Sequence, residues 1–344
     1  MRSKWLVLVV VLVIASMVLG ACQKAPEAPS QTLRINLGTY PDILDPQKAS
    51  FVNEIAHLQL MYEGLTKLNT ALETVPGAAE KWEYNADATE VTFTLRKNLK
   101  YSDGSLLNAK RFEYSLLRNI DPATAGEYAA ITDDIAGAAA WRGADLATAT
   151  AEQLAALKAG VAVHAYDTNG NPCTDYEQKT CLVLKVGTTN PAPYIHTVLS
   201  LWVTYPVKEE IVATDPDTWW TAAANHVGNG QFILSNLEAN SVANFTPNPN
   251  YWGGFAKVNL EYRYITDSAV AFEAYKNGEF DIVGLAAEDL ATVQADETLS
   301  KEAMIYPGSC TYAYMFHQEK EPFTDQKVRE AFAYALNREG WVKD

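Results

Sequence analysis

The stretch VTFTLRKNLKYSDGS, residues 91–105, carries the clearest local pattern of the chain. Its first six residues alternate apolar and polar side chains, which is typical of a strand with one buried face, and a turn-forming sequence ends the stretch. Residues 33–37, LRINL, alternate in the same way. Stretches with helical spacing of apolar residues lie between such strands, so the pattern predicts an α/β fold.

Two of the helical stretches end at a glycine. Residues 53–65 place apolar side chains at helical spacing and stop at Gly64. Residues 150–160 begin with a capping box, TAEQ, and stop at Gly160.

Two more helices are expected toward the end of the chain. Ser268 can cap a helix that Gly278 closes, and residues 280–283 then form a strand. The last helix begins at Asp325 and is expected to bury one apolar stripe. The residues of that stripe are Val328, Ala331, Phe332, Ala335 and Leu336.

Length and composition limit the class of protein. The 344 residues, 48% hydrophobic and 20% charged, suit two globular lobes or one large one and exclude a disordered tail, a collagen-like rod or a disulfide-dense miniprotein. Lys and Arg number 27 against 42 Asp and Glu, a net charge of -15. A surface that neutralises phosphates is therefore not available in bulk, and we expect no nucleic-acid partner.

The first residues have the features of an export signal. Arg2 and Lys4 precede an apolar run over residues 5–20, and LGAC at 19–22 ends it. This ending resembles a bacterial lipoprotein signal, in which residues 1–21 are removed and Cys22 becomes the lipidated first residue. An uncleaved membrane anchor is the alternative, although the run is about 24 Å long as a helix, shorter than a bilayer core.

The other cysteines are Cys173, Cys181 and Cys310. Cys173 and Cys181 flank a short excursion after a turn-rich sequence, and an exported chain meets an oxidising compartment, so we expect a disulfide between them. A metal site is the alternative, but no His or second Cys pair lies nearby. Cys310 is left without a partner, which suggests a missing partner or a free thiol.

Motifs for catalysis are not recognisable. The five His residues are far apart in sequence, and none has the spacing that places two metal ligands on one helical face. The motif Gly228-Asn229-Gly230 lacks the third glycine of a dinucleotide loop and is better read as a tight turn. We therefore expect no enzyme activity, no metal and no cofactor.

Eight short sequence motifs, which occur in order along nearly the whole chain, resemble those of the bacterial extracellular solute-binding proteins of family 5. These are the oligopeptide- and dipeptide-binding lipoproteins of ATP-driven (ABC) importers. Residues 93–105 are the strongest match, because strand, turn and spacing all agree. The other motifs are residues 37–47, 62–65, 76–83, 227–230, 248–252, 274–281 and 327–332.

The resemblance implies a type II periplasmic-binding-protein-like fold with two α/β lobes and an extra α/β subdomain on lobe one. It implies a tether at 22–32, a lobe one core at 33–52 and 207–309, the subdomain at 53–206, and a hinge crossing into lobe two at 310–344. Family members continue through a second lobe, so we expect that lobe to be largely missing here. With one wall of the cleft nearly absent, this chain is expected to bind peptide very weakly.

The resemblance also implies ligand contacts. Tyr40, Pro41 and Asp42 fall where the family's first strand pairs with an extended peptide, and Tyr128 matches a ring that faces the ligand. Gly228, Asn229 and Gly230 bring backbone close to the cleft, and Tyr312 and Tyr314 lie on the crossing strand. Some members carry on that strand a Cys bonded to the later half, which would explain Cys310.

We therefore expect a monomeric, non-catalytic receptor outside the cytoplasm, either anchored to the cell membrane by lipid or periplasmic. It would capture peptides or another extended small solute for a membrane permease. Within this class, nickel, sugar and opine ligands remain alternatives. Outside it, the alternatives are a secreted hydrolase with a scattered active site and a surface lipoprotein that binds partners through an exposed apolar patch.

Overall fold

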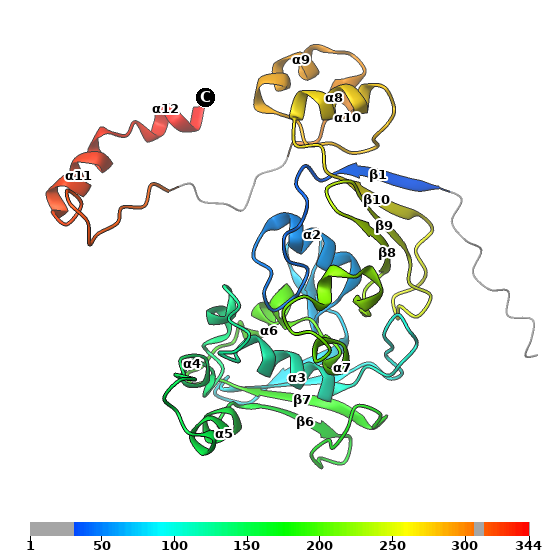
Figure 1. Cartoon of the computed structure of the whole chain (residues 1–344), viewed down its shortest axis with the longest axis vertical. Coiled ribbons are helices and arrows are strands. Elements are labelled where there is room, and N and C mark those ends of the chain that lie inside the picture. The colour runs from blue at the N-terminus through cyan, green and yellow to red at the C-terminus, as the bar shows by residue number, and fades with distance from the viewer. Residues whose placement is uncertain (1–30, 306–312, 344) are drawn as a thin grey trace, which may run out of the picture. The chain divides into compact units, whose positions relative to one another are not determined.

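The computed structural model describes residues 31–305 and 313–343. The chain divides into two units, residues 1–286 and 287–344, and each is described by itself. The first unit contains two four-stranded sheets and a short two-stranded one (Figure 1).

The first sheet contains the opening strand of the chain, which is the strand expected at 33–37. Its spatial order is β1-β10-β9-β8. The strands are β1 (Thr32–Asn36), β8 (Phe232–Glu238), β9 (Val242–Pro247) and β10 (Asn259–Arg263). β1 and β10 are parallel, although 222 residues separate Asn36 from Asn259 along the chain, and the other pairs are antiparallel. The long insertion between β1 and β8 therefore contains the rest of the unit except α8 and the other residues that follow β10.

The second sheet lies within that insertion. Its order is β4-β5-β7-β6, all antiparallel. The strands are β4 (Ala79–Tyr84), β5 (Glu90–Leu95), β6 (Val163–Asp167) and β7 (Cys181–Gly187). β5 is central, and Val91, Phe93 and Leu95 on it are at most 1% exposed while the residues between them are half-buried. The alternation seen at 91–96 therefore predicts this strand correctly.

Helices and short elements complete the first unit. The helices are α2 (Val52–Met61), α3 (Ala109–Asn119), α4 (Ala138–Arg142), α5 (Ala151–Ala159), α6 (Ile195–Val198), α7 (Glu209–Val212) and α8 (Ser268–Lys276). The short strands β2 (Thr66–Leu68) and β3 (Thr74–Pro76) pair with each other. The 3-10 helices are η1 (Ala129–Thr132), η2 (Trp202–Thr204), η3 (Trp219–Thr221) and η4 (Ala223–Asn225).

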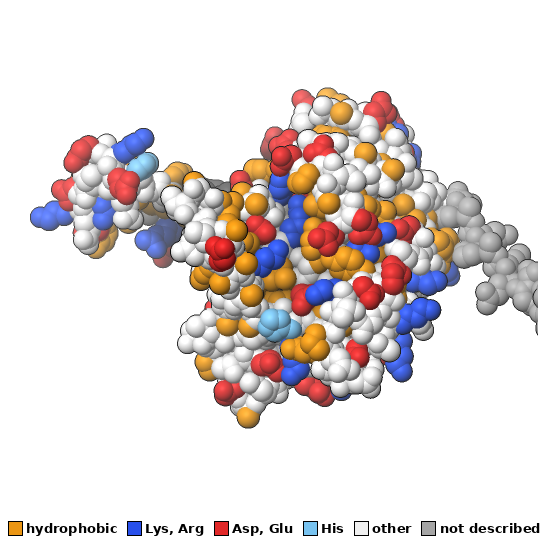
Figure 2. Space-filling model, turned by 60° about the horizontal axis from the view of Figure 1, so that its bottom comes forward, with side chains coloured by type: hydrophobic (Ala, Val, Ile, Leu, Met, Phe, Trp, Pro, Cys, Tyr) orange, Lys and Arg blue, Asp and Glu red, His pale blue; other side chains and the backbone are white. Residues whose placement is uncertain are grey.

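The unit has two hydrophobic cores. One packs α3 against the second sheet and includes Phe93, Tyr101 and Phe112, all 0% exposed. The other packs α2 against the first sheet and includes Leu58 and Phe245, also 0% exposed. On the face shown in Figure 2, acidic and basic side chains are interspersed around hydrophobic ones.

Most helix boundaries agree with the sequence, and two details are corrected. The capping box at 150–153 forms, with Thr150 and Gln153 accepting each other's backbone N–H. α2 ends at Met61, three residues before Gly64, because the chain becomes extended at Tyr62. Asp267, one residue before Ser268, caps α8 by accepting the N–H of Val270.

Residues 280–283 do not form the expected strand. Only an isolated bridge joins Ile282 to Ile35. The neighbouring Asp281 instead uses its carboxylate to accept hydrogen bonds from the backbone and guanidinium of Arg34, at 2.8 to 3.1 Å. Backbone hydrogen bonds also join Asn36 to Ile282 and Asp281 to Arg34, so the pairing at this edge of the sheet is real but too short to form a strand.

The Cys173 and Cys181 sulfur atoms are bonded, 2.03 Å apart, at the base of the loop between β6 and β7. Asn108, the cap of α3, donates to three carbonyl oxygens of this loop, those of Asp175, Tyr176 and Gln178, at 3.2 to 3.3 Å. The Tyr176 hydroxyl donates to Glu209 at the start of α7. The disulfide loop therefore connects the second sheet to α7, whose Val212 belongs to the core that packs against the first sheet.

The second unit holds η5 (Ala287–Asp289), α9 (Leu290–Ala295), α10 (Leu299–Glu302), α11 (Gln326–Ala335) and α12 (Arg338–Lys343). Asp325 caps α11 as expected, accepting the N–H of Lys327 at 2.8 Å.

The predicted burial of the α11 stripe is wrong: Phe332 is 53% and Leu336 40% exposed, and none of the five residues is buried. A stripe is buried only where another element covers it. Here Phe332 meets only the rings of Phe316 and Phe323 among the described residues.

Candidate functional site

The loop between β1 and α2 carries three of the predicted ligand-binding residues. Tyr40 is half-buried, with its ring edge-on to Tyr264 at 5.1 Å between centroids, and burial raises its pKa. Pro41 is buried and Asp42 is exposed. The backbone here is irregular, so the residues expected to extend the first strand lie beyond its end at Asn36.

The backbone of this loop has free hydrogen-bonding groups. Asn53 of α2 donates its side-chain amide to the carbonyl oxygens of Thr39 and Tyr40, at 3.3 and 2.9 Å. Within the described parts of the chain, the N–H groups of Tyr40 and Asp42 make no hydrogen bond. Exposed backbone donors of this kind are what an added extended segment pairs with.

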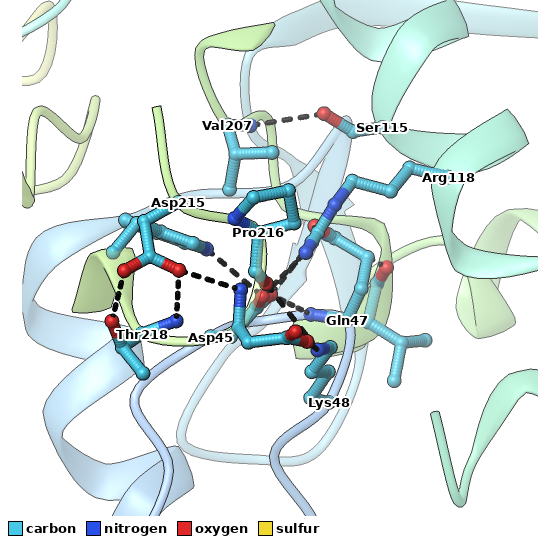
Figure 3. A network of polar contacts seen from close by, with 12 residues as sticks. Asp45, Gln47, Lys48, Ser115, Arg118, Val207, Asp215, Pro216 and Thr218 are labelled. Carbon is cyan, nitrogen blue, oxygen red and sulfur yellow. Dashed lines mark hydrogen bonds and ion pairs between the residues drawn. The ribbon is translucent and has the colours of Figure 1, made fainter. Parts of the chain in front are cut away.

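A buried charged network holds the next part of the loop (Figure 3). The Asp45 carboxylate is 0% exposed and accepts from both terminal nitrogens of Arg118 on α3 and from the indole N–H of Trp219, at 2.5 to 3.0 Å. Burial opposes the charge of Arg118, but its hydrogen bonds to Asp45 and their opposite charges raise its pKa overall. The loop is therefore tied to both cores by one ion pair.

Gln47 adds a second anchor to the same network. Its amide nitrogen donates to the carbonyl oxygens of Val203 and Tyr205, at 3.1 and 3.0 Å, and its amide oxygen accepts from Arg118 at 2.6 Å. Lys48 donates to Pro216 and to Asp217. With so many partners, residues 45–48 form a fixed base for the loop that carries Tyr40.

Tyr128 lies against this base. Its side chain is 42% exposed, and its ring meets Trp202 edge-on at 5.1 Å. The indole N–H of Trp202 donates to the carbonyl oxygen of Ala49 at 2.8 Å. A Cβ on Gly126 would lie 2.0 Å from the carbonyl oxygen of Gln47, so only glycine allows this approach. Tyr128 is thus positioned relative to the loop of Tyr40 through Trp202.

The predicted turn at 228–230 packs against the end of α2. A Cβ on Gly228 would lie 1.9 Å from the carbonyl oxygen of Met61. Asn229 is 2% exposed, and its amide pairs with the backbone N–H and C=O of Glu63 at 3.0 and 2.9 Å. These contacts give Gly228, Asn229 and Gly230 a structural role, and their contact with a ligand stays a prediction.

The Glu63 side chain is the centre of a further polar cluster that the sequence did not single out. It is 6% exposed and accepts from Lys67, from the hydroxyl of Tyr251 and from the indole of Trp252, at 2.5 to 2.8 Å. Burial and the charge of Glu63 raise the pKa of Tyr251. Residues 62–65 and 248–252 are two separate motifs in the sequence, and neither motif indicates that the two contact each other in the fold.

Several predicted residues cannot be placed. Cys22, Cys310 and Tyr312 lie outside the described residues. Tyr314 is 73% exposed in the second unit. Within residues 31–305 and 313–343, no group of three or more His, Cys, Asp or Glu side chains is arranged to hold a metal ion. The same residues include no helix that is long and apolar enough to cross a membrane.

Comparison with known proteins relates this architecture to binding proteins. The probable deoxycholate-binding periplasmic protein YgiS of Escherichia coli is 30% identical over 317 residues, covering 91% of this chain and 55% of that protein. The periplasmic oligopeptide-binding protein OppA of Salmonella typhimurium is 30% identical over 325 residues, covering 91% and 54%. This chain thus spans about half the length of these relatives.

Solved structures show the same fold. OppA of Haemophilus influenzae, in complex with the peptide RPPGFSPFR, superposes with a TM-score of 0.71 at 26% identity, over 92% of this chain and 57% of that one. The murein tripeptide-binding protein MppA of Escherichia coli gives a TM-score of 0.74 at 26% identity, over 91% and 57%. The mixed α/β fold expected from the sequence is therefore that of periplasmic peptide-binding proteins.

A family model settles the relationship. The model described as "Bacterial extracellular solute-binding proteins, family 5 Middle" matches residues 73–344, most of the chain. The match includes β5, the turn at 228–230 and two of the polar partners of Glu63, Tyr251 and Trp252. This chain therefore belongs to the bacterial extracellular solute-binding proteins of family 5.

Proposed function

We propose that this protein is the ligand-capturing component of an ABC importer and that it binds peptides outside the cytoplasmic membrane. Cys22 would carry the lipid that anchors it, and a membrane permease would receive the ligand. The names of its relatives support a peptide as the ligand, because these relatives include oligopeptide-, dipeptide- and murein peptide-binding proteins. The role is binding rather than catalysis.

The observation that carries this proposal is that the backbone N–H groups of Tyr40 and Asp42 make no hydrogen bond within the described residues. An extended peptide can pair with the free N–H groups of Tyr40 and Asp42, and such pairing is tolerant of peptide sequence because it uses main-chain atoms. Tyr128, exposed and held by Trp202, offers a ring and a hydroxyl near the same loop. Pairing of this kind favours a peptide over a compact solute.

Titration with tetra-alanine, followed by NMR of the backbone amides, tests the proposal. We expect the signals of Tyr40, Asp42 and Tyr128 to shift together at peptide concentrations up to the millimolar range. A tetra-alanine with methylated backbone nitrogens should bind more weakly, because the methyl groups obstruct the approach of its carbonyl oxygens to the N–H groups of Tyr40 and Asp42. Tyr128→Ala should weaken tetra-alanine binding, whereas Tyr194→Ala, another exposed tyrosine, should not.

Two results would overturn the peptide assignment. One is tetra-alanine leaving residues 40, 42 and 128 unaffected. The other is deoxycholate shifting these signals where tetra-alanine does not, which would favour the amphiphile named for the Escherichia coli relative. Mass spectrometry of protein purified from membranes would test the anchor, because lipidation of Cys22 removes residues 1–21 and adds acyl mass.

A further inference from the structure

A pocket of about 340 Å³ lies in the first unit beside the core that packs α2 against the first sheet, to which Tyr62, Trp202 and Tyr205 of its wall belong. Its wall is built from the end of α2, from β2, and from the segments around residues 202, 230 and 251. The volume is within the range of small-molecule sites. Trp202 is part of the wall and also contacts Tyr128, so the pocket adjoins the candidate peptide site without including Tyr40 or Tyr128.

Aromatic rings form much of this wall. Tyr62 and Tyr205 are stacked, with centroids 6.4 Å apart and ring planes at 22°. Trp202 and Tyr251 also line the pocket. Aromatic walls favour a flat ring that can stack or pack edge-on.

The Tyr205 hydroxyl is a polar group without a partner. Its side chain lines the pocket and is 6% exposed. The hydroxyl makes no hydrogen bond within the described residues and is not among their fully buried unpartnered atoms, so it is open to the pocket. Burial and the charge of Glu63 raise the pKa of Tyr205, so the hydroxyl is protonated and can donate at neutral pH. A ligand acceptor would satisfy it.

Charge in the pocket is balanced. The one cation of the wall, Lys67, is 2.8 Å from the carboxylate of Glu63 and 3.1 Å from the hydroxyl of Tyr251. An anionic ligand would face Glu63, and a cationic ligand would face Lys67. Each would have to disturb this pair, so an uncharged ligand is preferred.

We propose that this pocket is a second binding site, distinct from the peptide edge, for a small uncharged aromatic compound with a hydrogen-bonding group, of about the size of a phenol. The ring would lie among Tyr62, Trp202 and Tyr205. The polar group would meet the Tyr205 hydroxyl or the remaining N–H of Lys67. The side-chain amides of Gln59 and Gln231, at the rim, would provide further contacts.

Three phenols with a neutral, an anionic and a cationic substituent at the 4-position test this proposal on the full chain. They are 4-methylphenol, which is neutral, 4-hydroxyphenylacetate, an anion, and tyramine, a cation. In saturation-transfer NMR and calorimetry at pH 7 we expect 4-methylphenol to bind with a dissociation constant in the millimolar range or below. We expect the charged analogues to bind at least roughly fivefold more weakly, because each leaves a charge poorly compensated. Equal binding of all three, or no binding of 4-methylphenol, would refute the proposal.

Two variants locate the binding. Gln59→Trp places a bulky ring at the rim and should abolish binding, while Gln294→Trp, on exposed α9, is the matched control and should have no effect. Tyr205→Phe should weaken 4-methylphenol binding roughly threefold to tenfold, which is the contribution of one hydrogen bond to the binding free energy. The same substitution should not lower protein stability. If the Gln59→Trp protein binds 4-methylphenol like the wild type, the site lies elsewhere. Tetra-alanine binding is measured separately, so either proposal can fail alone.

Discussion

At the scale of single residues, the pair of Asp45 and Arg118 shows how one ion pair positions the loop that carries Tyr40. Asp45 is fully buried and Arg118 is 8% exposed, and both lie between the two cores. An ion pair in this environment adds little net stability, but loss of one partner leaves a buried charge uncompensated. The pair therefore matters mainly for where the loop lies.

We predict that Arg118→Met lowers the free energy of unfolding by about 3 to 5 kcal/mol, because Asp45 would stay buried without its cation. Arg142→Met is the control, since Arg142 and Asp133 form a pair that is about one third exposed, and such pairs contribute at most about 1 kcal/mol. Urea denaturation of both variants measures the difference. Equal effects of the two substitutions would contradict this account of Asp45.

At the scale of elements, the disulfide loop between β6 and β7 works with the cap of α3. Its disulfide restricts the unfolded chain, and Asn108 adds three hydrogen bonds in the folded one. We predict that replacing Cys173 and Cys181 with Ser lowers the free energy of unfolding by about 2.5 kcal/mol. Denaturation with and without reductant checks this. Reductant should destabilise the wild type and leave the double variant unchanged.

Helix α11 has an apolar face that stays exposed to solvent. Phe332 on α11 is 53% exposed, whereas Phe112 on α3 is 0% exposed. Phe332→Ala should therefore change the unfolding free energy by less than about 1 kcal/mol, and Phe112→Ala should lower it by about 3 to 5 kcal/mol. Thermal and urea unfolding compare the two. A large loss from Phe332→Ala would mean that the stripe is covered in solution.

At the scale of the whole molecule, two buried histidines make stability depend on pH. His57 lies against Tyr264, with 2.8 Å between Nε2 and the hydroxyl, and His226 is 2% exposed beside Trp219. Burial lowers the pKa of each to about 4, from an ordinary value near 6.5. Between these pH values the unfolded chain binds protons that the folded chain does not, so stability falls as the pH drops from about 6.5 toward 4.

We predict that lowering the pH from 7 to 5 reduces the unfolding free energy by roughly 2 kcal/mol for each of the two histidines. Urea denaturation at pH 7, 6 and 5 measures this slope. His57→Gln should remove about half of it, even if the variant is less stable at every pH. His164→Gln, at an exposed position on β6, should leave the slope unchanged. A slope that His57→Gln does not alter would contradict this assignment.

Local patterns in the sequence were sufficient for β1, β5, α5 and the family relationship. For the three elements the information is local, because alternation and capping boxes depend on near neighbours, and for the family it lies in eight short motifs that occur in order along the chain. The same patterns failed for residues 280–283 and for the burial of α11. Whether a strand pairs, or a stripe is covered, depends on a partner that is distant in sequence.

The chain's sequence alone predicted an acidic α/β protein of the family 5 binding proteins and marked the loop of Tyr40 as a candidate for ligand contact. Only the folded structure brought Trp202 between Tyr128 and Ala49, placed Arg118 on Asp45, and gathered Lys67, Tyr251 and Trp252 around Glu63. Most of these contacts join residues between 70 and 190 positions apart. No local pattern encodes such pairs, because burial and geometry select them only when the two cores pack together.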